Sequence, residues 1–178
     1  QWRWHPARGK WLGLTAARLQ ARRVEVNTGP AGPRPIVMPN TLDMPLRIEA
    51  AEAAVAELQI DALPALHQVQ AQQLQLWAGP GRGYEAQQLA GDWERARIEG
   101  SVSFGALPPY ALALQAKARS IGEGAPWSAQ LRAQGPLARF EVDLQLQGEA
   151  ATRGAAAPRL EVQAAITPLQ AWPLARLR

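Results

Sequence analysis

Side chains that could bind a metal ion or act in catalysis are few in this chain and lie far apart. The two histidines, His5 and His67, have no histidine or carboxylate at metal-ligand spacing. Aspartates such as Asp43 and Asp92 stand alone, and no serine has the context of an activated nucleophile. With no cysteine, thiolate chemistry, disulfides and cysteine-bound zinc are excluded. We therefore predict no catalytic residue, no metal site and no cofactor, and a protein that is not an enzyme.

A glycine-rich segment, Gly79–Gly83, could in principle cradle a phosphate group. Phosphate-binding loops lead into a helix, whose first backbone N–H groups contact the phosphate. No helix-forming run follows Gly83. Glycines in this pattern are also typical of a turn between two strands, so we predict a hairpin turn here.

The charge of the chain gives no sign of a nucleic-acid partner. Its 178 residues include 19 lysines and arginines against 15 acidic residues, for a net charge of +4. The basic residues are scattered apart from Arg18, Arg22 and Arg23, whereas nucleic-acid binding needs a clustered basic face. No stretch approaches the roughly 18 to 20 apolar residues that span a bilayer. We expect a mildly basic surface and no nucleic acid.

Apolar and polar residues alternate along most of the chain, which indicates strands with one apolar face. The clearest run is 138–147, where every second residue from Phe140 to Leu146 is apolar. An apolar face must be covered, so the nature of the cover decides what the protein does. The residues assigned to this face are Val102, Phe104, Tyr110, Leu112, Leu114, Trp127, Leu131, Phe140, Val142, Leu144, Leu146, Leu160, Val162 and Ile166.

Glycine and proline divide the alternating runs. Loops are predicted at about 27–43, 120–126 and 148–158, and the other connections are short, as in antiparallel meanders. Shifts in the alternation after Leu14 and at Gln72–Gln73 indicate bulges or bends. Residues Glu49–Leu58 have high helix propensity, so a helix is an alternative to a strand there. The predicted strands are 2–5, 10–20, 45–60, 65–77, 83–89, 93–105, 109–119, 126–134, 138–147 and 159–167.

The seven tryptophans of the chain lie beside a turn or at predicted strand boundaries. Two interpretations fit this placement. The rings could simply pack at the margins of the sheet, or they could form an amphipathic rim around an apolar groove, because an indole has an apolar body and a polar N–H.

Four segments carry a resemblance to a known family: Trp4–Ala21, Pro45–Ile60, Pro126–Phe140 and Ala171–Leu174. Together they resemble the periplasmic β-repeat region of the TamB proteins, within the AsmA-like group. The resemblance covers most of the chain and rests on β patterns. It implies an all-β, antiparallel-rich sheet, elongated and curled into an open groove of the β-taco or β-solenoid kind with an apolar concave face. Residues 1–178 would form a single segment of a longer periplasmic chain, with its inner-membrane anchor outside the segment.

The same resemblance implies a function. The groove would carry phospholipid between the inner and outer membranes of Gram-negative bacteria and support the assembly of outer-membrane proteins and autotransporters. Its partners would be phospholipid acyl chains, a TamA-like outer-membrane β-barrel and the flanking segments of its own chain. The alternative is a structural or adhesive β-sandwich or β-solenoid whose apolar faces pack against each other in a closed, dry core.

Overall fold

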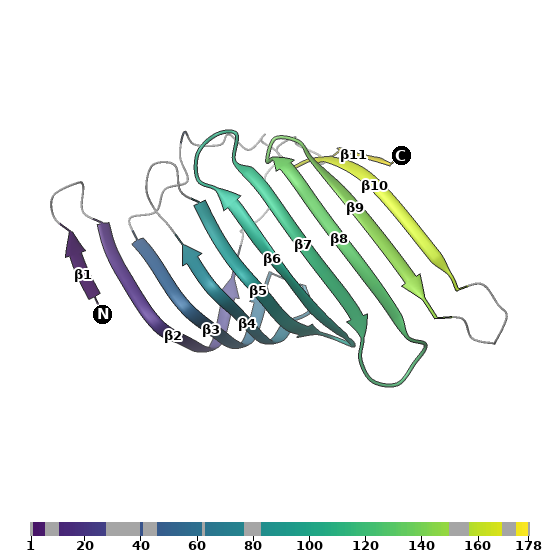
Figure 1. The fold of residues 1–178 in the computed structure, drawn as a ribbon, viewed down its shortest axis with the longest axis horizontal. Helices are drawn as coiled ribbons and strands as arrows, with labels where there is room; N and C mark the ends of the chain where they lie inside the picture. The colour runs from purple at the N-terminus through teal and green to yellow at the C-terminus, as the bar shows by residue number, and fades with distance from the viewer. Residues whose placement is uncertain are drawn as a thin grey trace.

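The computed structural model describes residues 2–5, 11–27, 40, 46–61, 63–76, 83–149, 157–168 and 174–177. Within these ranges the chain forms one eleven-stranded sheet whose strands follow one another in chain order (Figure 1). Nine long strands lie between two strands of four residues each. The strands are β1 (Trp2–His5), β2 (Trp11–Val26), β3 (Leu46–Ile60), β4 (Leu66–Leu76), β5 (Gly83–Trp93), β6 (Ala96–Gly105), β7 (Ala111–Ser120), β8 (Trp127–Pro136), β9 (Phe140–Gly148), β10 (Arg159–Thr167) and β11 (Leu174–Leu177).

Neighbouring strands run antiparallel except for β2 and β3. These two pair in parallel, from Leu12–Leu46 to Val26–Ile60. Parallel neighbours need a long connection, and most of segment 28–45, which joins them, lies outside the described residues. The sequence indicated a long loop here but not the parallel pairing that such a loop permits.

The strand predicted for residues Glu49–Leu58 is confirmed, and the helical alternative is wrong. Strand β3 extends without a break from Leu46 to Ile60. Its backbone pairs with β2 on one side and β4 on the other. Pairing along both edges outweighs the helix propensity of its alanines, because propensity is a weak preference compared with tertiary context.

Most predicted strands are confirmed, and the clearest error lies between β5 and β6. We predicted a break before Trp93, but β5 continues to Trp93 and the turn is made by Glu94 and Arg95. Glu94 has a positive φ of 51°. Across this turn Arg97 donates a hydrogen bond of 3.0 Å to Asp92. Asp92 therefore belongs to the paired ladder, although its sequence context resembles a turn.

Other boundaries also differ from the prediction. Strand β7 begins at Ala111 rather than at residue 109, so Tyr110 lies in the connection before it, and β8 and β9 are shifted by one or two residues. Strand β2 extends beyond residue 20 to Val26, and β11 was not predicted. The predicted loop 120–126 is confirmed over 121–126, because Ser120 ends β7. Most of the predicted loops 27–43 and 148–158, and Gly79–Arg82 of the predicted hairpin turn, lie outside the described residues.

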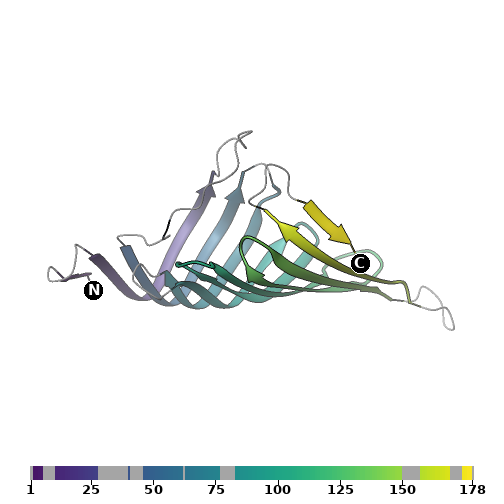
Figure 2. The same ribbon diagram turned by 90° about the horizontal axis from the view of Figure 1, so that it is seen from above.

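The long strands at the N-terminal end of the sheet bend along their length (Figures 1 and 2). Two rows of breaks in the pairing cross β2, β3 and β4. The first row lies at Ala17, Ala51 and Gln73, one residue in each strand. The second lies at Arg22, Ala56 and Gln68. Gln73 and Gln68 have positive φ angles of 52° and 51°. An unpaired residue reverses the alternation, so the apolar side chains stay on one face of the sheet through each bend. The predicted bends after Leu14 and at Gln72–Gln73 are confirmed.

The sheet is open, and it is neither closed nor strongly curled (Figure 2). Its all-β and mostly antiparallel character confirms the coarse fold prediction. Across the described ranges, the main contacts between strands are those between neighbours in the sheet, and no large side chain is fully buried. The buried apolar residues are Ala50, Ala71, Ala86, Ala96, Ala106, Tyr110 and Ala133. A single layer of strands thus stands where most domains have two.

Replacing Gln73 with valine tests the bend. A positive φ strains any side chain with a Cβ, and a β-branched one more than glutamine, so Gln73→Val should lower the free energy of unfolding by about 1 kcal/mol. Gln72→Val is the matched control, because Gln72 is exposed and lies within the pairing ladder, where valine is well tolerated. Urea unfolding measures both values. An equal effect of the two changes would contradict a left-handed bend at Gln73.

Candidate functional site

The apolar residues predicted from the sequence lie on one face of the sheet, in rows that cross the strands. Paired residues on neighbouring strands point to the same face, so the register defines each row. The first row contains Leu14, Ile48, Leu76, Tyr84, Phe104 and Leu112, and it continues in Phe140 and Ile166. Three further rows are Val102, Leu114, Ala133 and Val142; Ala116, Leu131, Leu144 and Val162; and Ala118, Ala129, Leu146 and Leu160. The structure therefore brings the predicted residues together on one apolar face.

This apolar face is not covered by other described parts of the chain. Leu131, Val142 and Leu144 in the middle of the face are half-buried, and the strands that carry them contact mainly their neighbours in the sheet. Leu146 and Leu160 are 36% and 51% exposed to solvent. Because a contiguous exposed apolar patch on a protein usually marks a binding surface, this face is the candidate functional site.

One edge of the apolar face is closed by aromatic rings. We call it the tyrosine margin; it comprises Tyr84, Phe104 and Tyr110 beside the hairpin 106–110. The Phe104 ring lies 6.3 Å from the Tyr84 ring and is stacked on the Tyr110 ring at 6.5 Å between centroids. Tyr110 is only 6% exposed and has a positive φ of 54°, which is uncommon for a bulky residue. Tyr110 is the one buried aromatic residue among those that the structure describes.

The opposite edge carries two tryptophans. We call it the tryptophan margin; it comprises Trp93 and Trp127, the turn 94–95 and the loop 121–126. Trp93 pairs with Ala96, and Trp127 pairs with Gly148, so both indoles belong to the apolar face. The Ile121 amide donates to the Arg95 carbonyl oxygen at 2.8 Å, which joins neighbouring connections along this edge. Trp93 is 40% exposed and Ile121 is 37% exposed.

The other face of the sheet is polar, and a hollow lies over it. The hollow has a volume of about 860 Å³ and extends from β5 to β10. Its walls include Glu85, Ser101, Gln115, Lys117, Gln130, Arg132, Asp143 and Gln163. Of the residues predicted to line an apolar groove, only Val102 and Leu131 border this hollow. Sequence periodicity assigned residues to faces correctly but could not indicate over which face a hollow would form, since that depends on the twist of the whole sheet.

No group of three or more histidine, cysteine, aspartate or glutamate side chains is placed to hold a metal ion among the residues described. In the same residues, no helix is long and apolar enough to cross a membrane.

The chain matches no family model, no curated protein and no solved structure. The resemblance to the TamB proteins therefore stays a prediction from the sequence.

Sequence reasoning missed several residues of the site. Tyr84 and Ile98 belong to the apolar face but were not assigned to it. The alternation of Tyr84 with Ala86, and of Ile98 with Ala96, was the signal that could have identified them. Ile121 and the packing role of Tyr110 had no such signal, because both lie in connections whose path depends on neighbouring hairpins.

Truncating Tyr110 tests the packing of the tyrosine margin. Tyr110→Ala should lower the free energy of unfolding by about 3 kcal/mol, as expected for removal of a buried aromatic ring. Leu107→Ala is the matched control, because Leu107 lies in the same hairpin but is 36% exposed, and it should cost well under half as much. Urea unfolding compares the two variants, and equal losses would show that the ring stack does not hold this edge.

Proposed function

We propose that the apolar face is the working surface of a lipid carrier, which holds the acyl chains of phospholipids without catalysing a reaction. The observation that carries this proposal is the continuous apolar face, from β2 to β10, over which no described part of the chain packs. Such a face in water is unfavourable, and covering it with hydrocarbon is favourable by about 25 cal/mol per Å². A lipid chain supplies such a cover.

The width of the face supports an acyl chain as the occupant. From Ile98 to Phe104 on β6 the apolar residues extend over about 20 Å at roughly 3.3 Å per residue. Half the hydrocarbon core of a bilayer, the span of one acyl chain, is about 15 Å. One extended chain therefore fits along the strand direction within the four apolar rows.

The energetics also favour a chain that can move. Burial contributes about 0.8 kcal/mol per CH₂ group, so a chain of about 14 carbons with half its surface on the sheet gains on the order of 5 kcal/mol. This gain is enough to hold a lipid and small enough to release it. The rows consist largely of leucine, valine and alanine, so one position along the sheet resembles the next.

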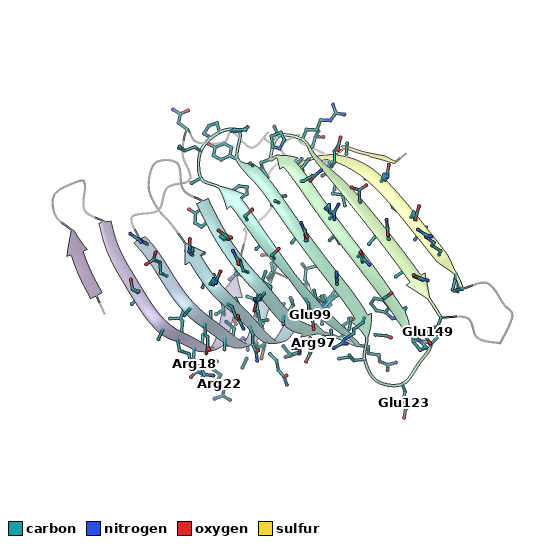
Figure 3. All side chains as sticks on the ribbon, viewed as in Figure 1. Arg18, Arg22, Arg97, Glu99, Glu123 and Glu149 are labelled. Atoms are coloured by element: carbon teal, nitrogen blue, oxygen red, sulfur yellow. The ribbon has the colours of Figure 1, made fainter. Side chains whose placement is uncertain are left out.

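The bends in β2, β3 and β4 support the finer proposal of an open groove. Arg18 and Arg22 lie on the outer side of the bend (Figure 3), while Leu19 alternates with them and is half-buried. We therefore propose that the bend turns the apolar face of β2, β3 and β4 inward, as the concave wall of a groove at this end of the sheet. Nine long strands spaced by about 4.8 Å give the whole apolar face a length of about 40 Å.

The cellular setting rests on the resemblance to the TamB proteins. It supports a segment of a longer, inner-membrane-anchored chain in the periplasm, working with a TamA-like outer-membrane β-barrel. In that setting the chain would pass phospholipid between the two membranes and support outer-membrane protein assembly. The sandwich alternative requires a second sheet, and the described residues of one chain supply only one.

Placing a charge in the apolar face tests the proposal. Leu131 lies in the third apolar row, and the adjacent Gln130 points to the polar face. Leu131→Glu should sharply reduce the phospholipid that copurifies with the protein, because a carboxylate on the face disfavours hydrocarbon. Gln130→Glu adds the same charge to the same strand and should leave bound lipid unchanged. Native mass spectrometry and phosphorus assay measure the lipid, and circular dichroism confirms the sheet.

Two results would contradict a lipid carrier. The first is lipid-free wild-type protein after incubation with phosphatidylethanolamine vesicles. The second is a wild-type dimer in analytical ultracentrifugation that Leu131→Glu, but not Gln130→Glu, converts to monomer without any effect on lipid. That pattern would assign the apolar face to a sandwich between two copies of the chain.

A further inference from the structure

The two margins of the apolar face differ, and this difference gives a direction to a bound lipid. Rings of Phe104 and Tyr110 stack at the tyrosine margin, and Tyr110 is buried. At the tryptophan margin the large apolar residues Trp93, Ile121, Leu146 and Leu160 are exposed. The face is therefore packed at one edge and open at the other.

Polar groups also mark the open edge. Figure 3 places Glu123 and Glu149 near the tryptophan margin. Arg97 and Glu99 lie near it as well, but their pairing with Arg119 and Lys117 puts their side chains on the polar face. Arg97 is held by Asp92 at 3.0 Å and approaches Glu99 at 3.9 Å. The connections of this edge are themselves charged: exposed Glu94 and Arg95 form the turn beside Trp93, and exposed Glu123 lies in the loop before Trp127. Tryptophan is favoured where hydrocarbon meets a polar layer, because its ring is apolar and its N–H donates a hydrogen bond.

We infer that an acyl chain lies along the strands of β5–β10 with its methyl end against the tyrosine margin and its polar head group at the tryptophan margin. This inference rests on the proposed function and adds to it the orientation of the lipid. A head group at the tyrosine margin would lie over stacked rings, whereas at the tryptophan margin it lies beside indoles and charged side chains. The chain end, which needs no polar contact, meets the stacked rings of Phe104 and Tyr110 and a hairpin, 106–110, that has no charged residue.

The absence of cysteine from the chain makes this orientation measurable. Leu160 and Ile166 belong to the same strand and the same face, near opposite margins. Leu160→Cys and Ile166→Cys, each labelled with a small fluorophore, report on the tryptophan and tyrosine margins. Glu161→Cys is the matched control, because Glu161 is adjacent to Leu160 but points to the polar face.

The probes are two phosphatidylcholines, one with a nitroxide on the choline group and one with a nitroxide at the end of an acyl chain. After incubation with vesicles of phosphatidylcholine that contain one probe, the protein is separated by gel filtration. The head-group nitroxide should quench Leu160→Cys more than Ile166→Cys, and the chain-end nitroxide should reverse this order. Glu161→Cys should lose little fluorescence with the chain-end probe.

The outcomes separate this inference from the proposed function. Equal quenching of Leu160→Cys and Ile166→Cys by both probes, or the opposite order, would show bound lipid without the inferred direction, so the orientation would be overturned and the carrier would stand. No quenching at either position, with lipid absent from the separated protein, would overturn both.

Discussion

The fold depends on backbone hydrogen bonding between neighbouring strands, because no second layer of described structure packs on either face of the sheet. In most domains the apolar face of a sheet is buried against a helix or another sheet, and that burial supplies much of the stability. Here the apolar side chains cover one another only within the sheet. Each cross-strand pair contributes on the order of 0.2–1 kcal/mol, so stability is distributed over many similar pairs.

A sheet stabilised in this way can bend while its apolar and polar side chains stay on their respective faces. At Gln73 and Gln68 the backbone takes positive φ angles, and the strand reverses its alternation there. The corresponding breaks in β2 and β3 line up with them, so neighbouring strands bend together and the ladder continues on both sides. Gln88 in β5 has a positive φ of 47° beside a register shift. Beyond β5 the pairing of β6 to β10 is regular.

Sequence periodicity predicted the strands and their faces because both are local properties. Side chains in a strand alternate every second residue, so Phe140, Val142 and Leu144 reveal their face without knowledge of the fold. The parallel pairing of β2 with β3 could not be predicted, because it depends on which strand β2 meets after a long connection. The same holds for the stack of Phe104 with Tyr110 and for the hollow over the polar face. These features arise from several hairpins together.

The proposed function depends on the same single layer of strands, because its apolar side chains form an open surface instead of an enclosed core. A binding pocket holds one ligand by surrounding it, and departure then requires the loss of most contacts together. A lipid acyl chain on rows of leucine, valine and alanine can move sideways by one strand spacing of about 4.8 Å. It then loses contacts with the strand on one side and gains similar contacts with the strand on the other. The barrier to this movement is therefore small compared with the total gain on binding. Length can increase by adding strands while the width stays set by strand length, so such a sheet suits transport over a distance better than selection of one ligand.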